Sequence, residues 1–275
     1  MSEFQTPSTP PPLTVAHSAG FFSCTTIFLE HILDYFNRYH VPPETIHSEG
    51  MYTWYKMQHN SPQDIKTEYF LAHNRDIAIP PYTDRTICTT SKPIEQQYVH
   101  YQYLNYADVT PFVKHYFSPS PTIEAIMSDL QDKYALIPER TCVLFYRGND
   151  KAKETSLPSY DKYLQTARSL LNTDPEMRIW IQSDETEFLD AMKAAFPDNH
   201  VIFYDEIRHM PRNPQTTVDK KFYSQNYIMS KYYLAITYLM SQCKYVICGT
   251  GNCSLWIALF RGHNEGMTQF NYWVR

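Results

Sequence analysis

The sequence predicts an α/β protein whose second half forms a parallel sheet with helices on both faces. From about residue 141, short apolar segments alternate with segments of helical periodicity, the pattern of a sheet built from strand–helix–strand units. Glycine is scarce, with 7 in 275 residues, and four glycines directly follow predicted strands. At 43% hydrophobic and 19% charged, the chain has enough apolar side chains for a core, which excludes wholesale disorder.

The first 118 residues carry the weaker pattern. Residues 13–16 (LTVA) are expected to form a strand, and residues 26–39 a helix with partly periodic apolar positions. Beyond them the sequence is rich in Tyr and His without regular spacing. Residues 118–121 (SPSP) are the clearest break in the chain, and residues 122–134 after it are expected to be helical.

The second half carries the stronger pattern. Four short β-branched or aromatic segments are expected to be strands: 141–147 (TCVLFYR), 178–182 (RIWIQ), 200–204 (HVIFY) and 244–248 (KYVIC). Helical spacing of apolar residues predicts helices around 163–171, 188–196 and 226–242, and a last helix from near Asn252. Asp184, with Glu187 three residues on, resembles a capping box that opens the second of these helices.

We therefore expect two lobes with a cleft between them. A Pro-rich tail covers residues 1–12, a first lobe 13–118 and a second lobe 119–275. The net charge of −5 and the isoelectric point near 6.1 argue against a nucleic-acid-binding protein.

The sequence also bears on the compartment. No apolar run approaches the ~18 residues of a membrane span, so none is expected. The N-terminal MSEFQTPSTPPPL has neither a basic n-region nor an apolar h-region, so we expect no secretory signal and a cytoplasmic location. In that compartment the six cysteines are expected to be free thiols.

Three loops after predicted strands contain glycine, through Gly20, through Gly148, and through Gly249 with Gly251. At the carboxyl ends of parallel strands, such loops let backbone N–H groups approach an anion. The segment GTGNCS is therefore a candidate diphosphate cradle and comprises Gly249, Thr250, Gly251, Asn252, Cys253 and Ser254. The alternative is that these glycines only form tight turns. No G-x-G-x-x-G or G-x-x-x-x-G-K-[ST] motif occurs, which disfavours a Rossmann-type dehydrogenase or a P-loop NTPase.

Charged residues cluster directly after the strand at 141–147. Arg147 can reach a phosphate with both ends of its guanidinium, and Lys151 adds a second positive charge for a leaving diphosphate. Glu154 is the right kind of group for a general base, and Asp150 is expected to hold one of the two cations in place. The alternative is an ordinary solvated loop.

A family resemblance appears at this cluster. Residues 147–151 (RGNDK), with Glu154 and the Tyr-Leu pair at 163–164, resemble the His-x-Arg-Arg-x-Asp-Lys segment of the O- and core-fucosyltransferase-like glycosyltransferases. Residues 179–185 (IWIQSDE) are similar to that group's strand ending in an acidic pair, and residues 241–260 to its final strand and Ser-rich loop. The blocks AHSAGFFS, FYRGNDK, QSDETEF and GNCS resemble, more narrowly, glycosyltransferases of large algal DNA viruses.

The resemblance implies the GT-B fold, with two Rossmann-like lobes, the donor nucleotide on the second lobe and the acceptor in the cleft. It implies transfer of a sugar from a nucleoside diphosphate to a hydroxyl of an oligosaccharide or glycoprotein, usually with inversion. By it, Arg147 contacts the donor diphosphate, Lys151 matches the motif lysine, Glu154 matches the proposed base, and residues 250–254 replace the phosphate-binding serines. No cofactor or metal is implied, and the chain contains no D-x-D motif.

The sequence departs from the family at the base-reading positions. Phe145 replaces the motif histidine, Gly148 replaces the second arginine, and no acidic residue stands near Ile236. These departures favour a UDP-sugar over GDP-fucose. The resemblance to viral glycosyltransferases implies UDP-xylose as the first choice and a viral capsid-protein glycan as acceptor in an infected host cell. GDP-fucose transfer stays open as the alternative, as do a nucleotide- or carbohydrate-binding module without catalysis and a sugar-phosphate or nucleotide-processing enzyme.

Other residues have two interpretations each. His17, in the loop after the first strand, is expected to face the cleft and is a further catalytic candidate. Asp184 is expected to cap a helix or to contact the nucleotide. Residues 205–209 (DEIRH) either touch the nucleobase or ribose or form an internally paired turn. Trp54 and Tyr55 either stack on an acceptor sugar or fill the core.

The cysteines at 243, 248 and 253 lie five apart. Zinc sites favour closer Cys pairs, so these are expected to be small buried residues, and no metal site is predicted.

Overall fold

The computed structural model describes residues 10–58, 61–73, 78–79, 84–88 and 96–272. Its main sheet has five parallel strands in the order β5-β4-β3-β6-β7. The strands are β3 (Thr141–Tyr146), β4 (Arg178–Ser183), β5 (His200–Val201), β6 (Tyr245–Gly249) and β7 (Met267–Phe270). The predicted α/β class with a parallel sheet is confirmed.

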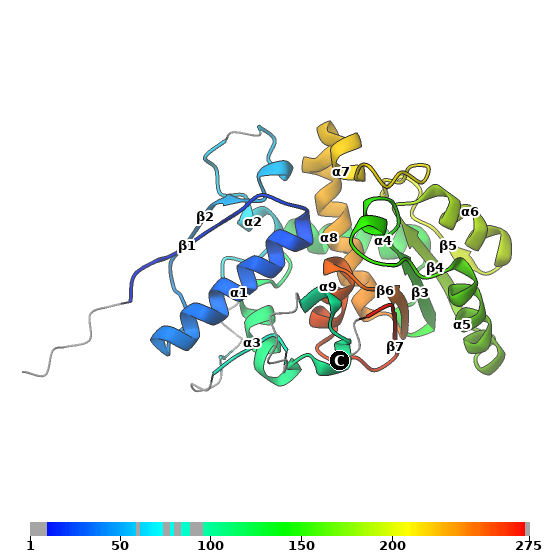
Figure 1. Cartoon of the computed structure of the whole chain (residues 1–275), viewed down its shortest axis with the longest axis horizontal. Coiled ribbons are helices and arrows are strands. Elements are labelled where there is room, and N and C mark those ends of the chain that lie inside the picture. Colours follow the sequence, from blue (N-terminus) through cyan, green and yellow to red (C-terminus); the bar gives the residue numbers. More distant parts are fainter. Residues whose placement is uncertain (1–9, 59–60, 74–77, 80–83, 89–95, 273–275) are drawn as a thin grey trace, which may run out of the picture.

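Helices lie on both faces of this sheet (Figure 1). On one face are α5 (Tyr160–Thr173) and α6 (Thr186–Ala195), and on the other are α4 (Pro121–Tyr134), α8 (Asn226–Gln242) and α9 (Asn252–Arg261). The side chains of β3 alternate between these faces, because successive residues of a strand point to opposite sides. Tyr146 stacks on Phe188 of α6 at 4.6 Å between ring centroids. All six residues of β3 are buried, as expected for a central strand covered on both faces.

The strand order places a topological switch point between β3 and β6. After the central strand β3, the chain adds β4 and β5 on one side of it. It then crosses back and adds β6 and β7 on the other side. Ligands of open parallel sheets bind outside the carboxyl ends of the strands at such a point. A ligand site is therefore expected at the loops after β3 and β6.

The N-terminal part has less β-structure than predicted. Its described residues contain one two-stranded parallel sheet, of β1 (Leu13–His17) and β2 (Ile46–Met51), where a Rossmann-like lobe was expected. Its longer helices are α1 (Phe21–Tyr39) and α3 (Tyr106–Tyr116). This part also contains the short helix α2 (Lys66–Tyr69) and the 3₁₀ helices η1 (Thr53–Tyr55), η2 (Gln96–Tyr98) and η3 (Tyr101–Tyr103). The second half of the chain contains the short helix α7 (Val218–Lys221) and the 3₁₀ helices η4 (Pro138–Arg140), η5 (Asn149–Lys153) and η6 (Tyr223–Gln225).

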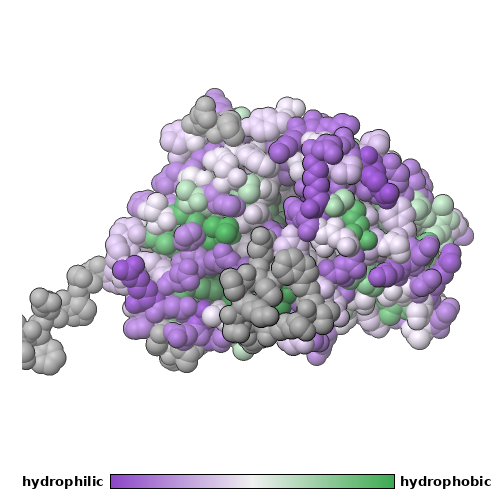
Figure 2. Space-filling model, in the orientation of Figure 1, coloured by the Kyte–Doolittle hydropathy of each residue, from purple (hydrophilic) through white to green (hydrophobic). Residues whose placement is uncertain are grey.

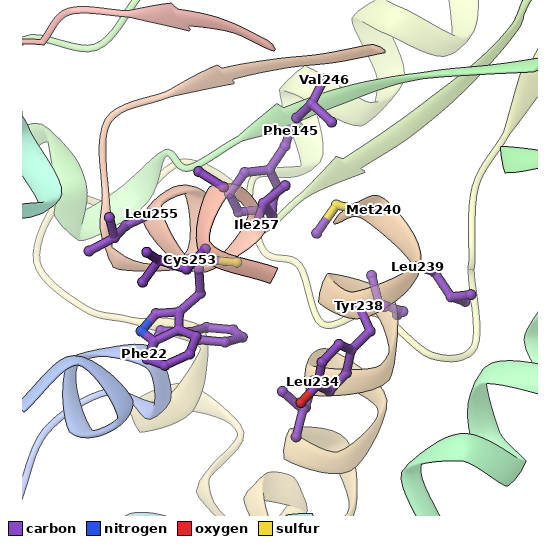
Figure 3. Close-up of a cluster of buried hydrophobic side chains, with 14 of the residues drawn as sticks. Phe22, Phe145, Leu234, Tyr238, Leu239, Met240, Val246, Cys253, Leu255 and Ile257 are labelled. Atoms are coloured by element: carbon purple, nitrogen blue, oxygen red, sulfur yellow. The ribbon is translucent and has the colours of Figure 1, made fainter. Parts of the chain in front are cut away.

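The two parts share a continuous hydrophobic core. Figure 1 shows α8 and α9 between the N-terminal elements and the main sheet. In the close-up of Figure 3, Phe22 of α1 lies near α9, and its ring centroid is 6.5 Å from that of Trp256. Trp256 of α9 donates from Nε1 to Oγ1 of Thr26 at 3.0 Å, and its ring lies 4.9 Å from that of Phe117. The boundary at residue 118 stays a prediction, and most of the Pro-rich tail lies outside the described residues.

Several element boundaries differ from the sequence predictions. Helix α1 begins at Phe21, five residues earlier than expected, because its first turn is buried in the core. Strand β5 ends at Val201, and strands β2 and β7 were not predicted. The capping box is wrong: the N-cap of α6 is Glu185, and the Asp184 carboxylate bonds elsewhere.

The surface is mixed in character. Figure 2 shows hydrophilic residues over most of one face, with apolar residues in small separate patches. No helix in the described part of the chain is long and apolar enough to cross a membrane. Cys243, Cys248 and Cys253 are buried, as predicted.

Candidate active site

A cavity of about 500 Å³ lies at the switch point and is lined by residues of both parts of the chain. The N-terminal part contributes the start of α1, Trp54 and the 3₁₀ turn at 96–98. The main sheet contributes the ends of β3 and β4, the start of α9, and the segments around 206–208 and 217–220. The volume is in the range of small-molecule sites, and the walls combine apolar surface with charged groups, as such sites do.

Arg147 stands on the wall just after β3, held by two carboxylates. Its Nη1 donates to Oδ2 of Asp184 at 2.6 Å, and its Nη2 donates to Oδ1 of Asp150 at 3.2 Å. The Asp184 side chain is 6% exposed and also accepts from the backbone N–H of Gly148 at 2.9 Å. Burial raises the pKa of Asp150, although the charge of Arg147 opposes the shift. Asp184 therefore anchors the guanidinium, and Asp150 is the weaker, more easily exchanged partner.

Lys151 and Glu154 form the adjoining wall. The Lys151 ammonium donates to Oε2 of Glu154 at 2.6 Å and to Oε1 of Gln97 at 2.9 Å. Tyr98 donates to the same Oε2 at 3.1 Å. Burial lowers the pKa of Lys151, although the hydrogen bond and charge of Glu154 oppose the shift. Because an ammonium has three donors, one of its hydrogens is left for a ligand.

The glycine-containing segment 249–254 divides into two groups. Gly251, Asn252 and Cys253 line the cavity at the start of α9, where the helix dipole favours an anion. The backbone at Gly251 runs close to Lys151: a Cβ there would lie 3.4 Å from Cε of Lys151.

The other three residues of the segment do not line the cavity. Gly249 faces Tyr163 and Pro158, Thr250 donates to the backbone oxygen of Phe270 at 3.2 Å, and Ser254 is buried. Of the six residues predicted as a cradle, these three are therefore turned into the fold and away from the cavity.

Two further predicted site residues, Gly148 and His17, do not line the cavity. The N–H of Gly148 is taken by Asp184, and a Cβ at Gly148 would collide with the carboxyl of Glu185, so this glycine serves close packing. His17 does not line the cavity, but its Nε2 lies 3.2 Å from Oγ of Ser23, which does. His17 therefore does not face the cavity as expected and reaches it only through its contact with Ser23.

The polar segment 205–209 is both internally paired and part of the wall. Arg208 donates to Oδ1 of Asp219 at 2.6 Å, and Tyr55 donates to Oδ2 of the same carboxylate at 2.9 Å. Arg208, Asp219 and Glu206 line the cavity. Asp219 was not predicted as a site residue, because nothing in the local sequence pattern indicates that it pairs with Arg208. Tyr55 is fully buried, which confirms its core interpretation.

Carboxylates on the wall differ in exposure. Among the ion-paired carboxylates lining the described cavity, the Glu154 side chain is 45% exposed, and the other four range from 6% to 23%. Within the described ranges, no group of three or more His, Cys, Asp or Glu side chains is arranged to hold a metal ion.

The chain matches no protein-family model and no curated protein. Among solved structures it is similar to POFUT1 in its apo form, with 10% identity over 56% of this chain and 47% of that chain and a TM-score of 0.39. It is also similar to the α-1,6-fucosyltransferase NodZ soaked with GDP-fucose (11% identity, 57% and 48%, TM-score 0.36) and to NodZ from Bradyrhizobium (13%, 57% and 47%, TM-score 0.34). The matched region spans about half the length of these chains.

Proposed function

We propose that the chain is a glycosyltransferase that moves a sugar from a nucleoside diphosphate to a hydroxyl of an oligosaccharide or glycoprotein without a metal ion. One observation carries the proposal: Arg147, Lys151 and the start of α9 line a single cavity at the switch point of a parallel sheet. A guanidinium, an ammonium and a helix N-terminus form a site for a diphosphate.

The diphosphate binds beside Arg147 and Lys151, which are positioned by carboxylates and still have hydrogen-bond donors for a ligand. Asp184 keeps one end of the Arg147 guanidinium in place, while a phosphate oxygen replaces Asp150 at the other end. Asp150 is the easier of the two carboxylates to displace, because its contact with the guanidinium is 3.2 Å long against 2.6 Å for Asp184 and its side chain is 23% exposed against 6%. Lys151 donates its remaining hydrogen, and the backbone N–H groups at 252–253 complete the site. Charge that develops on the leaving diphosphate is stabilised by groups already in position.

Glu154 is the base in this proposal. The acceptor hydroxyl oxygen attacks the anomeric carbon, the bond from that carbon to the diphosphate oxygen breaks, and the hydroxyl proton passes to Glu154. Direct displacement inverts the anomeric carbon. Glu154 is favoured by its exposure and because Lys151 and Tyr98 both bond to Oε2, which leaves Oε1 for the acceptor. Trp54 lines the same cavity and offers an aromatic face for a sugar ring.

We infer a UDP-sugar as donor, with UDP-xylose the first choice and GDP-fucose the alternative. Phe145 and Ile236, the positions where fucosyltransferase-like sequences place base-reading polar groups, both line the cavity. Their apolar side chains leave a guanine with fewer partners. A viral capsid-protein glycan as acceptor in the cytoplasm of an infected cell belongs to the same proposal.

A binding module without catalysis is the second candidate. It is favoured by one observation, that Arg147 and Lys151 each already pair with a carboxylate in the cavity. Such a protein binds a nucleotide and never consumes a donor.

The experiment is turnover and binding of a nucleotide-sugar panel with a matched pair of variants. Arg147→Ala removes the guanidinium at the carboxyl end of β3, and Arg140→Ala removes an exposed one beside its amino end. We expect UDP-sugar consumption, lost in Arg147→Ala and kept in Arg140→Ala. Turnover of GDP-fucose alone would mean that the donor is GDP-fucose and not a UDP-sugar. Tight UDP binding with no donor consumed would favour a binding module without catalysis.

A further inference from the structure

Gln182 presents an unsatisfied amide at the cavity. It is the fifth residue of β4, its side chain lines the cavity, and the residue is 5% exposed. Its Oε1 is buried and has no hydrogen-bond partner. Among the described residues that line the cavity, Gln182 is the one with a buried side-chain polar atom that has no hydrogen-bond partner. Because buried polar groups are almost always bonded, this oxygen needs an explanation.

The surroundings of Gln182 are apolar. In the parallel register of β3 and β4, Phe145 lies directly beside Gln182, so the two side chains share a face of the sheet. Ile207 and Ile236 line the cavity as well, and all three apolar residues are buried. Figure 3 shows Phe145 projecting from the sheet toward α9. The amide thus stands on an apolar wall, where a hydrogen bond to a ligand is worth more than in water.

A carboxamide beside an aromatic ring suits a flat heterocycle with a polar edge. It offers one acceptor and one donor side by side, which is how Asn and Gln pair with nucleobase edges. Uracil carries an N3–H next to its O4, and guanine an N1–H next to its O6. Either edge supplies the N–H that Oε1 lacks and an acceptor for Nε2.

We propose that Gln182 reads the base of the donor nucleotide by accepting its ring N–H. This inference rests on the proposed function and adds to it a residue that determines donor specificity. A ribose or sugar hydroxyl in the same place could also donate to the oxygen, but it would be insensitive to the substituent on the ring nitrogen.

The test crosses a change in the ligand with a change in the protein. Calorimetry gives the Kd of UDP and of N3-methyl-UDP, which lacks the N–H, for the wild type, Gln182→Ala and Gln165→Ala. Gln165 is an exposed glutamine on α5, on the opposite face of the sheet, and serves as the control. GDP and N1-methyl-GDP form a second arm that separates the two bases. Inorganic pyrophosphate, which has no base, reports on the diphosphate site alone.

We expect N-methylation to weaken binding to the wild type and to Gln165→Ala by about 10- to 100-fold, the effect of leaving a buried acceptor unpaired. In Gln182→Ala the methylated and unmethylated nucleotides should bind within about threefold of each other, and pyrophosphate should bind as to the wild type. Equal discrimination in Gln182→Ala and wild type would overturn the role of Gln182 and leave the proposed function standing. Absence of any nucleotide or pyrophosphate binding to the wild type would overturn both. The methylated ligands test the wild type directly, even if Gln182→Ala does not fold.

Discussion

Arg147 donates from Nη1 to Oδ2 of Asp184 at 2.6 Å, joining the carboxyl ends of two neighbouring strands, β3 and β4. The second oxygen of Asp184 accepts from the N–H of Gly148. The guanidinium is thus positioned by a nearly buried carboxylate before any ligand arrives.

Asp184→Asn should reduce both stability and donor affinity. It removes the charge that compensates Arg147 near the protein interior, and we expect a loss of about 2 kcal/mol in the free energy of unfolding and a tenfold weaker nucleotide Kd. Asp174→Asn is the control, because Asp174 pairs with Lys244 at the surface, where both side chains are at least 31% exposed. Its loss should stay below about 0.5 kcal/mol. Urea unfolding and calorimetry measure the two quantities, and equal losses in both variants would refute the anchoring role.

Glu154→Gln should lower the rate of transfer and leave donor affinity nearly unchanged. A general base contributes about 10²- to 10⁴-fold, and the amide keeps an oxygen for Lys151 and Tyr98. Glu176, exposed between α5 and β4, provides the control Glu176→Gln. Single-turnover kinetics with saturating donor separates rate from binding. Full activity of Glu154→Gln would mean that another residue takes the proton.

Lys151 should give binding and stability opposite dependences on pH. Burial lowers its pKa below the ordinary 10.5 despite the opposing charge of Glu154. Nucleotide affinity should fall as the pH rises through this lowered pKa, because the ammonium loses its charge. Over the range from the lowered pKa up to 10.5 the unfolded chain binds more protons, so the stability contribution of this residue rises with pH. Kd and urea-unfolding profiles of Lys151→Met should lack both components; unchanged profiles would contradict the assignment.

Gly148→Ala should destabilise the fold, and Gly20→Ala should not. A Cβ at Gly148 would lie 2.8 Å from Cδ of Glu185, a fully buried carboxylate held by Arg212 and Asn149. Overpacking of this kind costs about 1–3 kcal/mol. A Cβ at Gly20 meets nothing within 4 Å, and its backbone is extended, so Gly20→Ala should be neutral or slightly stabilising. Thermal unfolding of the two variants checks the contrast, which a similar loss in both would disprove.

The sequence predicts the main sheet well, because its strands and helices keep strong periodicity. The bounds of α8 agree with the prediction, and β3 ends one residue before Arg147. The N-terminal part was harder, because α3 contains Pro111 inside the helix and β2 (IHSEGM) has no regular alternation of polar and apolar residues. Strand β7 has four residues, too few for a period to show.

The candidate site was predictable where its residues are adjacent in sequence. The cluster from Arg147 to Glu154 follows one strand, and the structure keeps its cavity-facing members together. Contacts between distant segments were not predictable, such as Arg208 with Asp219 or Gln97 with Lys151. Asp184 was ambiguous because its local pattern fits a helix cap, whereas its partner, Arg147, follows the neighbouring strand β3.

A crystal structure of the protein with UDP bound would show directly where the diphosphate lies. We expect it within hydrogen-bonding distance of Arg147 and Lys151 and against the first N–H groups of α9. A nucleotide bound elsewhere, or a diphosphate that leaves Asp150 on Arg147 and makes no contact with Lys151, would rule this site out.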